Sequence, residues 1–222
     1  MNTPSPTAAP KLLVIASGNA GKLREFTALL ASASPGLNLE LRSQPQGLEV
    51  DETGDSFAAN ARLKAEAVAR ITGQWALADD SGLSVEALGG APGIHSARYA
   101  DSDQERIARL LRELAGEGNR RATFTAALAV ADPSGRTVLE VEGRCQGEIL
   151  EAPGGDSGFG YDPVFLVPET GLSFAQMTPE LKRRVGHRGR AVDALLPQLL
   201  QLFSADGERT TAHQGGQPRQ RA

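Results

Sequence analysis

The stretch KLLVIASGNAGKLREFTALL, residues 11–30, contains the transition that decides the fold. Its first part, Lys11–Ser17, is a short apolar run with β-branched residues, which is typical of a buried strand. The following residues, Ala20–Ala33, place apolar side chains at helical spacing. These side chains are Leu23, Phe26, Leu29 and Leu30. The stretch therefore predicts a strand, a glycine-containing turn and a helix in direct succession.

The turn Ser17–Lys22 (SGNAGK) is a candidate anion site. A helix N-terminus presents unpaired backbone N–H groups and a positive dipole end, and two glycines allow a phosphate to approach the backbone closely. The turn does not match the Walker A loop, because two residues separate its glycines instead of four and Leu23 follows the lysine. An ordinary strand-to-helix turn with a solvated lysine remains the alternative.

Two adjacent carboxylates follow the next predicted strand. A helix expected over Ser56–Ile71, with Ser56 or Asp55 as N-cap, leads into a strand at Trp75–Ala78, and Asp79 and Asp80 come directly after it. Ligands of α/β sheets commonly bind at such strand ends, and adjacent carboxylates repel each other unless a cation compensates. We therefore expect a Mg²⁺ site here, with Glu52 as a second ligand from another loop. The alternatives are a capping turn and a solvated charge.

The second half of the chain is expected to contain antiparallel strands as well as helices. Asp103–Leu114 has the pattern of an amphipathic helix, and a hairpin is expected around the turn-forming Asp132–Gly135. The remaining expected elements are hairpin strands over Ala122–Ala131 and Thr137–Val141, a strand over Asp162–Val167, and a closing helix over Ala191–Phe203 interrupted or kinked at Pro197. Early alternation of strands and helices followed by antiparallel strands predicts an α/β fold with a mixed sheet.

Composition narrows the classes of function. The chain has 222 residues, with 23 Lys and Arg against 27 Asp and Glu, so its net charge of −4 gives no general attraction for nucleic acid or anionic membranes. Cys145 stands alone, and no long apolar run or secretory signal occurs, so a cytoplasmic location is expected. Low apolar content predicts disordered tails at 1–10 and 204–222 around one domain over 11–203.

Two later segments carry residues that suit a flat, anionic ligand. Pro153–Pro163 places two aromatic residues among glycines, and Lys182–Arg190 is the densest basic stretch. A tight structural loop and a solvated face are the alternatives. Gly155–Gly158 (GDSG) is similar to the nucleophile segment of trypsin-like proteases, but such enzymes need further triad members and typically several disulfides, which a chain with one cysteine cannot form.

Five segments, taken in order, resemble the inosine triphosphate pyrophosphatase family of the Ham1/RdgB type. The segments are SGNAGKLREF at Ser17–Phe26, ETGDSFAANARLKA at Glu52–Ala65, ADDSGLSVEALGGAPGIHSARYA at Ala78–Ala100, GFGYDPVF at Gly158–Phe165 and GHR at Gly186–Arg188. Each is weak alone, but their order and spacing are specific, and the similarity covers residues 11–203. The resemblance implies an elongated, two-lobed α/β fold with a long mixed sheet around a central nucleotide cleft, usually in a homodimer.

The resemblance also implies the activity and the site. Members hydrolyse ITP, dITP and XTP to the monophosphate and pyrophosphate with Mg²⁺, which Glu52 and Asp80 would hold, and Asp80 would be the proton acceptor with Lys22 assisting. Phosphate contacts would come from Ser17, Gly18, Asn19, Ala20, Gly21, Lys22, Asn60 and Lys64. The rest of the nucleotide site would be Ser81, Phe159, Gly160, Tyr161, Asp162, Lys182, His187 and Arg188. We expect His187 or Arg188 to donate to the C6 keto group and Phe159 to stack on the base.

The departures from the family pattern are few. Gly186 stands where the family commonly has serine, and Arg183–Arg184 replace residues that are often smaller or neutral, which concerns fine selectivity and not the reaction. A Maf-type pyrophosphatase, which shares a similar opening loop, is disfavoured by the DDSGL and GHR segments. A catalytically silent nucleotide sensor is disfavoured because Glu52 and Asp80 are both present.

Overall fold

The computed structural model describes residues 10–18, 20–33 and 38–213. Asn19, residues 1–9 of the predicted N-terminal tail and residues 214–222 of the predicted C-terminal tail therefore lie outside the described residues. Its strands form one mixed sheet in the order β2-β1-β3-β4-β5-β6-β7, in which β1 is parallel to both neighbours and the other pairs are antiparallel. The strands are β1 Lys11–Ile15, β2 Leu39–Ser43, β3 Trp75–Val85, β4 Arg121–Ala131, β5 Thr137–Ile149, β6 Phe165–Val167 and β7 Leu172–Ser173. The predicted α/β class with a mixed sheet is confirmed.

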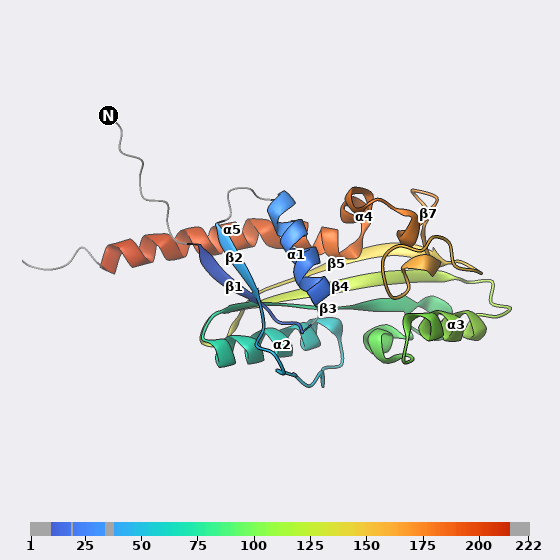
Figure 1. The fold of residues 1–222 in the computed structure, drawn as a ribbon, viewed down its shortest axis with the longest axis horizontal. Coiled ribbons are helices and arrows are strands. Elements are labelled where there is room, and N and C mark those ends of the chain that lie inside the picture. The colour runs from blue at the N-terminus through green and yellow to red at the C-terminus, as the bar shows by residue number, and fades with distance from the viewer. Residues whose placement is uncertain (1–9, 19, 34–37, 214–222) are drawn as a thin grey trace, which may run out of the picture.

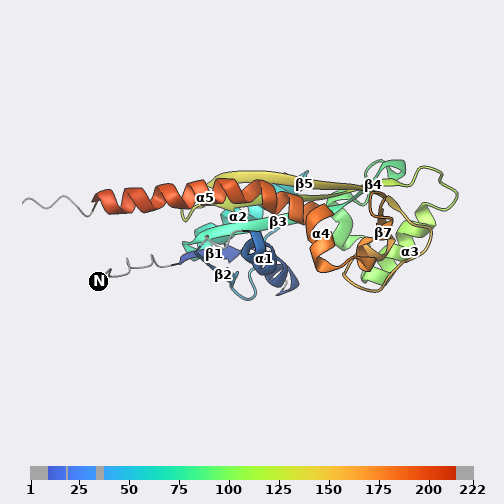
Figure 2. The same ribbon diagram turned by 90° about the horizontal axis from the view of Figure 1, so that it is seen from above.

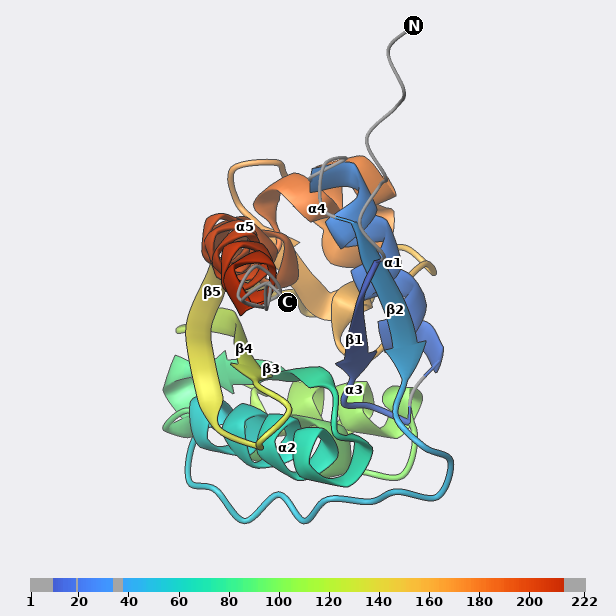
Figure 3. The ribbon, with the colours of Figure 1, turned by 90° about the vertical axis from the view of Figure 1, so that its left-hand side faces the viewer.

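The molecule is elongated because β3, β4 and β5 run along most of its length (Figure 1). Helices α1 and α5 cover one face of the sheet at one end, and α2 covers the opposite face, as the end-on view in Figure 3 shows. Helix α3 and the short α4 lie toward the other end (Figure 2). The helices are α1 Ala20–Ala33, α2 Phe57–Thr72, α3 Asp103–Glu113, α4 Pro179–Val185 and α5 His187–His213. None of the described helices is long and apolar enough to cross a membrane.

Three buried clusters hold these layers together. Phe26 of α1 and Leu195 of α5 pack on one face of β1, β3 and β4. On the opposite face, small residues such as Ala61 and Ala65 bring α2 close to the sheet. A third cluster around Phe165 joins α3 to the distal ends of β3, β4 and β5. The two lobes therefore share one continuous sheet, and the site lies where they meet.

Local signals fixed several element boundaries. The predicted helix Ala20–Ala33 agrees with α1, and Ser56 caps α2 by accepting a hydrogen bond from the Ala59 N–H. Ser102 and Glu105 form a reciprocal capping box at the start of α3. The predicted hairpin is confirmed, and β5 extends without interruption to Ile149.

The prediction that a strand ends at Ala78 is wrong, because β3 continues to Val85. Antiparallel pairing with β4 holds β3 from Ala76 to Val85, which the local sequence does not indicate. Strand β1 nevertheless ends at Ile15, opposite Leu77, so Asp79 and Asp80 lie beyond the carboxyl end of the parallel neighbour. The expected position at a strand end is therefore correct for β1 and wrong for β3.

Two further expectations differ from the structure. Asp162–Val164 forms a 3-10 turn, and only Phe165–Val167 of the predicted strand is extended. Helix α5 begins at His187 and runs through Pro197 to His213, so the predicted helix over Ala191–Phe203 is too short at both ends. The missing N–H of Pro197 removes one helical hydrogen bond, which the packing of Leu195 and Leu199 against the sheet outweighs.

Candidate functional site

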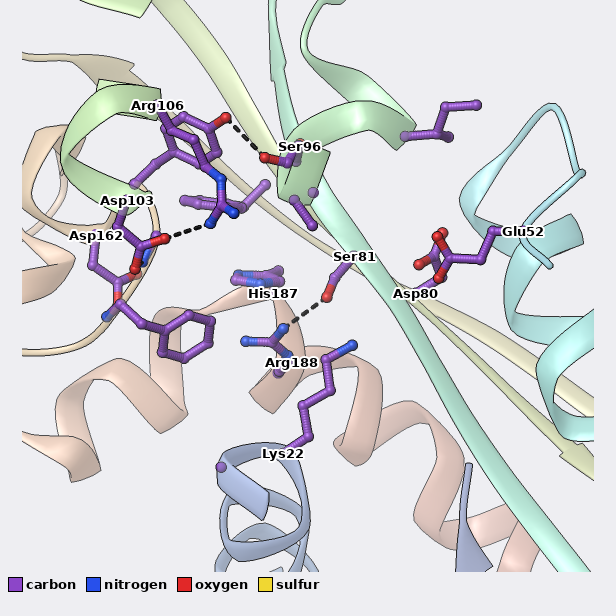
Figure 4. A pocket seen from close by; sticks show the side chains of 18 of the residues that line it. Lys22, Glu52, Asp80, Ser81, Ser96, Asp103, Arg106, Asp162, His187 and Arg188 are labelled. Atoms are coloured by element: carbon purple, nitrogen blue, oxygen red, sulfur yellow. Dashed lines mark hydrogen bonds and ion pairs between the residues drawn. The ribbon is translucent and has the colours of Figure 1, made fainter. Parts of the chain in front are cut away.

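The site is a cleft between the lobes with a volume of about 510 Å³. Its walls come from the start of α1, the middle of β3, the 3-10 turn Gly93–Arg98, the loop 158–162 and the start of α5. Most of the predicted site residues line it: Gly21, Lys22, Glu52, Asp80, Ser81, Phe159, Gly160, Tyr161, Asp162, His187 and Arg188. Figure 4 shows Glu52 and Asp80 together at one end of this cleft, whereas an aromatic ring lies toward the other end with Arg106, Asp103 and Asp162. We call these the carboxylate end and the aromatic end.

At the carboxylate end, Glu52 and Asp80 converge on one cation. The Lys64 ammonium lies 2.8 Å from Glu52 Oε1 and 2.8 Å from Asp80 Oδ1, and it also donates to the Asp79 carbonyl at 3.0 Å. The described residues contain no group of three or more His, Cys, Asp and Glu side chains suited to a metal ion. Two convergent carboxylates do match Mg²⁺, which usually takes one or two carboxylates together with phosphate oxygens and water.

Burial and charge act differently on these two carboxyl groups. Burial raises the pKa of Asp80, and the opposing attraction of Lys64 does not fully offset it, so the pKa stays above its ordinary value. Burial also raises the pKa of Glu52, but hydrogen bonds from Lys64 and Arg98 outweigh it and the net pKa is lowered. The raised pKa of Asp80 suits a proton acceptor, whereas the lowered pKa of Glu52 suits a carboxylate that stays ionised.

The Asp79 carboxylate does not pair with Lys64, the cation that the Asp80 carboxylate binds. The two adjacent carboxylates therefore do not form one site, as the sequence had suggested. Successive side chains of a strand point to opposite faces, so Asp79 points toward α1 and α5 while Asp80 points toward α2. Asp79 Oδ2 lies 2.8 Å from Lys22 Nζ and 3.5 Å from an Arg188 nitrogen. Burial opposes its charge, but Lys22 and Arg188 hold the pKa of Asp79 well below its usual range. Asp79 is therefore a buried counter-ion.

The aromatic end centres on Phe159, which is 53% exposed toward the cleft. The cations of Lys182 and Arg188 lie 5.4 Å and 5.3 Å from the centre of its ring. Asp162 fixes this arrangement, because its Oδ2 accepts from the Phe159 N–H at 2.9 Å and pairs with Lys182 at 2.6 Å. Lys182 does not line the cleft itself but supports the loop that carries Phe159, and its contact with a ligand stays a prediction.

His187 and Arg188 begin α5 and face the cleft from below the sheet (Figure 4). The His187 ring stacks on Phe124 with centroids 4.7 Å apart, and burial holds its pKa well below the ordinary value, so the imidazole is neutral. Arg188 donates to Ser81 Oγ at 2.8 Å, while its buried Nε has no protein partner among the described residues. The His187 Nδ1 is also unpartnered there, which leaves two polar atoms for a ligand.

A second cavity of about 420 Å³ adjoins the cleft, and both are lined by Lys22 and Glu52. Ser17, Gly18 and Lys64 also line this second cavity, so the predicted phosphate residues gather beside the carboxylate end. Arg98 lines it too and forms an ion pair with Glu52 Oε2 at 2.5 Å. The combined space suits an elongated ligand that carries several negative charges near Lys22, Lys64 and Arg98.

Asn19 lies outside the described residues, and Ala20 is the first residue of α1, so its backbone belongs to the helix N-terminus. Asn60 is fully buried and lines neither cavity; its Oδ1 accepts from the Gly54 N–H at 2.8 Å, so it holds the loop that carries Glu52. The prediction that Asn60 lines the phosphate side is therefore wrong in detail, because the side chain supports the wall from behind.

Sequence reasoning missed several residues of the cleft. Asp103 and Arg106 line the aromatic end from α3, but their positions indicated only a cap and an exposed helix face. Gly82 was not singled out, although a Cβ there would lie 2.5 Å from Ser96 Oγ and 2.6 Å from the Gly93 carbonyl. This glycine lets the Gly93–Arg98 turn approach β3 closely. No local pattern reveals such an approach, because its cause is a tertiary contact.

Known proteins are similar to this chain over most of its length. A family model described as "Ham1 family" matches residues 13–198. A dITP/XTP pyrophosphatase of Nostoc is 56% identical over 198 residues, which cover 89% of this chain and 99% of the relative. A protein of the same description from Parasynechococcus marenigrum is 60% identical over 196 residues, covering 88% and 98% of the two chains.

Solved structures agree with this similarity. The Ham1 protein of Staphylococcus aureus matches with a TM-score of 0.74 at 38% identity, covering 89% of this chain and 100% of its own. A Ham1 protein from Coxiella burnetii matches with a TM-score of 0.79 at 38% identity, over 86% and 99% of the two chains. Both therefore share the elongated mixed-sheet architecture described above.

Proposed function

The chain belongs to the Ham1 family, and on this basis we propose that it hydrolyses noncanonical purine nucleoside triphosphates. The substrates are dITP, ITP, XTP and dXTP, and the products are the nucleoside monophosphate and pyrophosphate. The observation that carries the proposal is the pairing of two convergent carboxylates with an aromatic, basic pocket at opposite ends of one cleft. The dITP/XTP pyrophosphatase name of relatives at 53–60% identity supports it.

A divalent cation, Mg²⁺, fits the carboxylate end. Glu52 and Asp80 come from different elements, and both already hold a cationic group, the Lys64 ammonium, at 2.8 Å. The two carboxylates would hold the ion together with phosphate oxygens of the substrate. When bound, Mg²⁺ supplies neutralisation of the charge that develops on the pyrophosphate leaving group.

The chain's own residues position the triphosphate and the attacking water. The N-terminus of α1 and Lys22 bind phosphate oxygens, and Lys64 balances the carboxylates beside them. Asp80 accepts the proton of the water that attacks the α-phosphorus, because its carboxylate lines the cleft and its pKa is raised. Asp79 stays ionised and holds Lys22 in place.

At the aromatic end, the base stacks on Phe159. Inosine and xanthosine carry a keto group at C6, whereas adenosine carries an amino group there. The unpartnered Nε of Arg188 donates to the keto oxygen, and an adenine amino group would leave that buried donor unpaired. The pocket thus favours 6-keto purines over adenine.

We further propose that the chain acts as a cytoplasmic homodimer that removes these nucleotides from the cellular pool, as the family resemblance implies. Light scattering on the purified protein tests the dimer. A mass of one chain, 23.3 kDa, over the working concentration range would exclude it.

The reaction is tested by pyrophosphate release from dITP, XTP, dATP, dGTP and dTTP, each with Mg²⁺ and with a chelator. We expect rapid release from dITP and XTP only, and loss of release when the metal is chelated. Equal rates with dATP and dITP would overturn the proposed selectivity. Full activity in chelator would overturn the metal requirement.

A further inference from the structure

Arg106 enters the aromatic end of the cleft from α3, across the pocket from Arg188 on α5 (Figure 4). Two of its nitrogens are engaged: Nη1 pairs with Asp103 Oδ1 at 2.5 Å, and Nε donates to the Ala100 carbonyl at 3.0 Å. These two bonds fix the plane of the guanidinium. Its third nitrogen, Nη2, has no protein partner among the described residues.

The acceptors around Arg106 are already occupied. Asp103 Oδ2 accepts from the Gly160 N–H at 2.7 Å, while its Oδ1 is held by Arg106. Asp162 Oδ2 likewise serves both the Phe159 N–H and Lys182. The carboxylates of this end therefore serve the loop 158–162 and the cations. The two opposed guanidinium groups then offer spare donors to whatever lies between them.

A purine presents its C6 and C2 substituents on either side of N1. Hypoxanthine has a keto oxygen at C6 and hydrogen at C2, xanthine has keto oxygens at both positions, and guanine has an amino group at C2. We propose that Arg106 contacts the C2 position while Arg188 contacts C6. This inference rests on the proposed function and deepens it, because it explains how guanine, which shares the C6 keto group, is excluded.

The two arginines then recognise different substituents of the base, Arg106 the one at C2 and Arg188 the one at C6. A donor at Arg106 gains a charge-assisted hydrogen bond to the C2 oxygen of xanthine and is indifferent to the C2 hydrogen of hypoxanthine. The 2-amino group of guanine is itself a donor, so it faces a second donor and both stay unpaired. A hydrogen bond to a charged group corresponds to roughly tenfold to hundredfold in kcat/KM.

The experiment compares kcat/KM for XTP, dITP and dGTP in wild type, Arg106→Met and Arg106→Gln. Methionine keeps the length of the side chain but removes its donors, so the XTP:dITP ratio should fall by about tenfold or more. Glutamine adds a carbonyl acceptor, so the dGTP:dITP ratio should rise severalfold. Arg106 also holds Asp103, so any general loss of rate is taken out by using dITP, which has only hydrogen at C2, as the reference in both ratios.

Two controls separate recognition from loop support. Arg109→Met changes the next turn of α3, where the side chain pairs with Glu113 and does not line the cleft, and should leave all three ratios unchanged. Asp162→Ala removes the acceptor of the Phe159 N–H without touching the partners of Arg106, and should lower the rates with all substrates in equal proportion. Binding of XMP and IMP by calorimetry without metal gives the same comparison independently of turnover.

Each outcome has a definite meaning. A proportional loss with all three substrates in both Arg106 variants would overturn the inference, because Arg106 would then act only by holding Asp103. Unchanged ratios would overturn it as well, while leaving the proposed function intact. A wild type that releases no pyrophosphate from dITP or XTP would overturn the proposed function, and the inference with it.

Discussion

The Lys22 ammonium lies 2.8 Å from Asp79 Oδ2 and 3.2 Å from the carbonyl oxygen of the same residue. The same carboxylate oxygen lies 3.5 Å from Arg188, so one buried residue serves a cation from the start of α1 and one from the start of α5. Asp79 Oδ1 has no protein partner among the described residues. The residue is thus the electrostatic link between the phosphate side and the aromatic end.

Asp79→Asn should destabilise the protein, because Lys22 and Arg188 would keep their charges without a buried counter-ion. Breaking such a pair costs about 3 kcal/mol or more, which corresponds to a fall in Tm of roughly 6–12 °C for a chain of this size. Thermal unfolding without ligand measures it. The control Glu86→Gln breaks an exposed pair with Arg121 and should lower Tm far less, because solvent screens such a pair. Equal shifts in both variants would contradict the assigned role of Asp79.

The local patterns around these residues explain which parts of the fold could be predicted. The boundaries of α1 and the caps of α2 and α3 depend on residues close in sequence, so spacing and capping chemistry sufficed. The extension of β3 past Ala78 depends on pairing with β4, some fifty residues away in the register Asp79↔Leu128, and no local signal reports it. The end of α5 was misplaced because polar composition outweighed helical continuation in the prediction.

The same distinction applies to the site. Lys22, Glu52 and Asp80 could be predicted because they sit in motifs whose order resembles a family. The side chains of Asp79 and Asp80 point to opposite faces because successive residues of a strand alternate. This could not be predicted, because the sequence did not show that both residues lie inside a strand. Arg106 carried no signal at all, because a helix arginine becomes a pocket residue only through the packing of α3 beside the loop 158–162.

Asp80→Asn should remove the proton acceptor without removing the nucleotide pocket. We expect kcat for dITP to fall by about 10²- to 10⁴-fold, with KM changed only severalfold. Steady-state pyrophosphate release measures both constants, and calorimetric binding of IMP verifies that the aromatic end is intact. A kcat within threefold of wild type would show that another group accepts the proton.

Lys64→Met should make the protein more dependent on Mg²⁺ for its stability. Without the ammonium, Glu52 and Asp80 face each other with no cation between them, so a divalent ion relieves more repulsion than in wild type. The rise in Tm on adding Mg²⁺ should therefore be larger in the variant. The control Arg62→Met lies on the same helix in an exposed pair with Glu140 and should respond as wild type does. A smaller Mg²⁺ response in Lys64→Met would contradict a shared site for the two cations.

His187 should make the fold sensitive to mild acid. Its folded-state pKa is well below 6.5, because burial disfavours the charged ring and Arg188 repels it. The unfolded chain binds a proton below pH 6.5 and the folded chain does not, so this contribution to stability is present above pH 6.5 and is lost as the pH falls. The loss therefore grows as the pH falls from 6.5 toward 5. Urea unfolding of wild type and His187→Phe at pH 7 and pH 5 measures it, and an identical pH dependence in both would contradict the prediction.

Gly143→Ala tests whether β5 sets the position of the basic groups without touching the cleft. A Cβ at Gly143 would lie 2.2 Å from the His187 carbonyl and 2.3 Å from the Ala191 nitrogen, so the first turn of α5 must move away from the sheet. That turn carries Arg188, whose distance to Ser81 is 2.8 Å. We expect a loss of about 1–3 kcal/mol in stability and a lower dITP:dATP ratio in kcat/KM. The control Gly118→Ala adds a Cβ with no atom within 4 Å and should leave both quantities unchanged. If Gly143→Ala loses stability but keeps the ratio, the placement of α5 on β5 does not govern the choice of base.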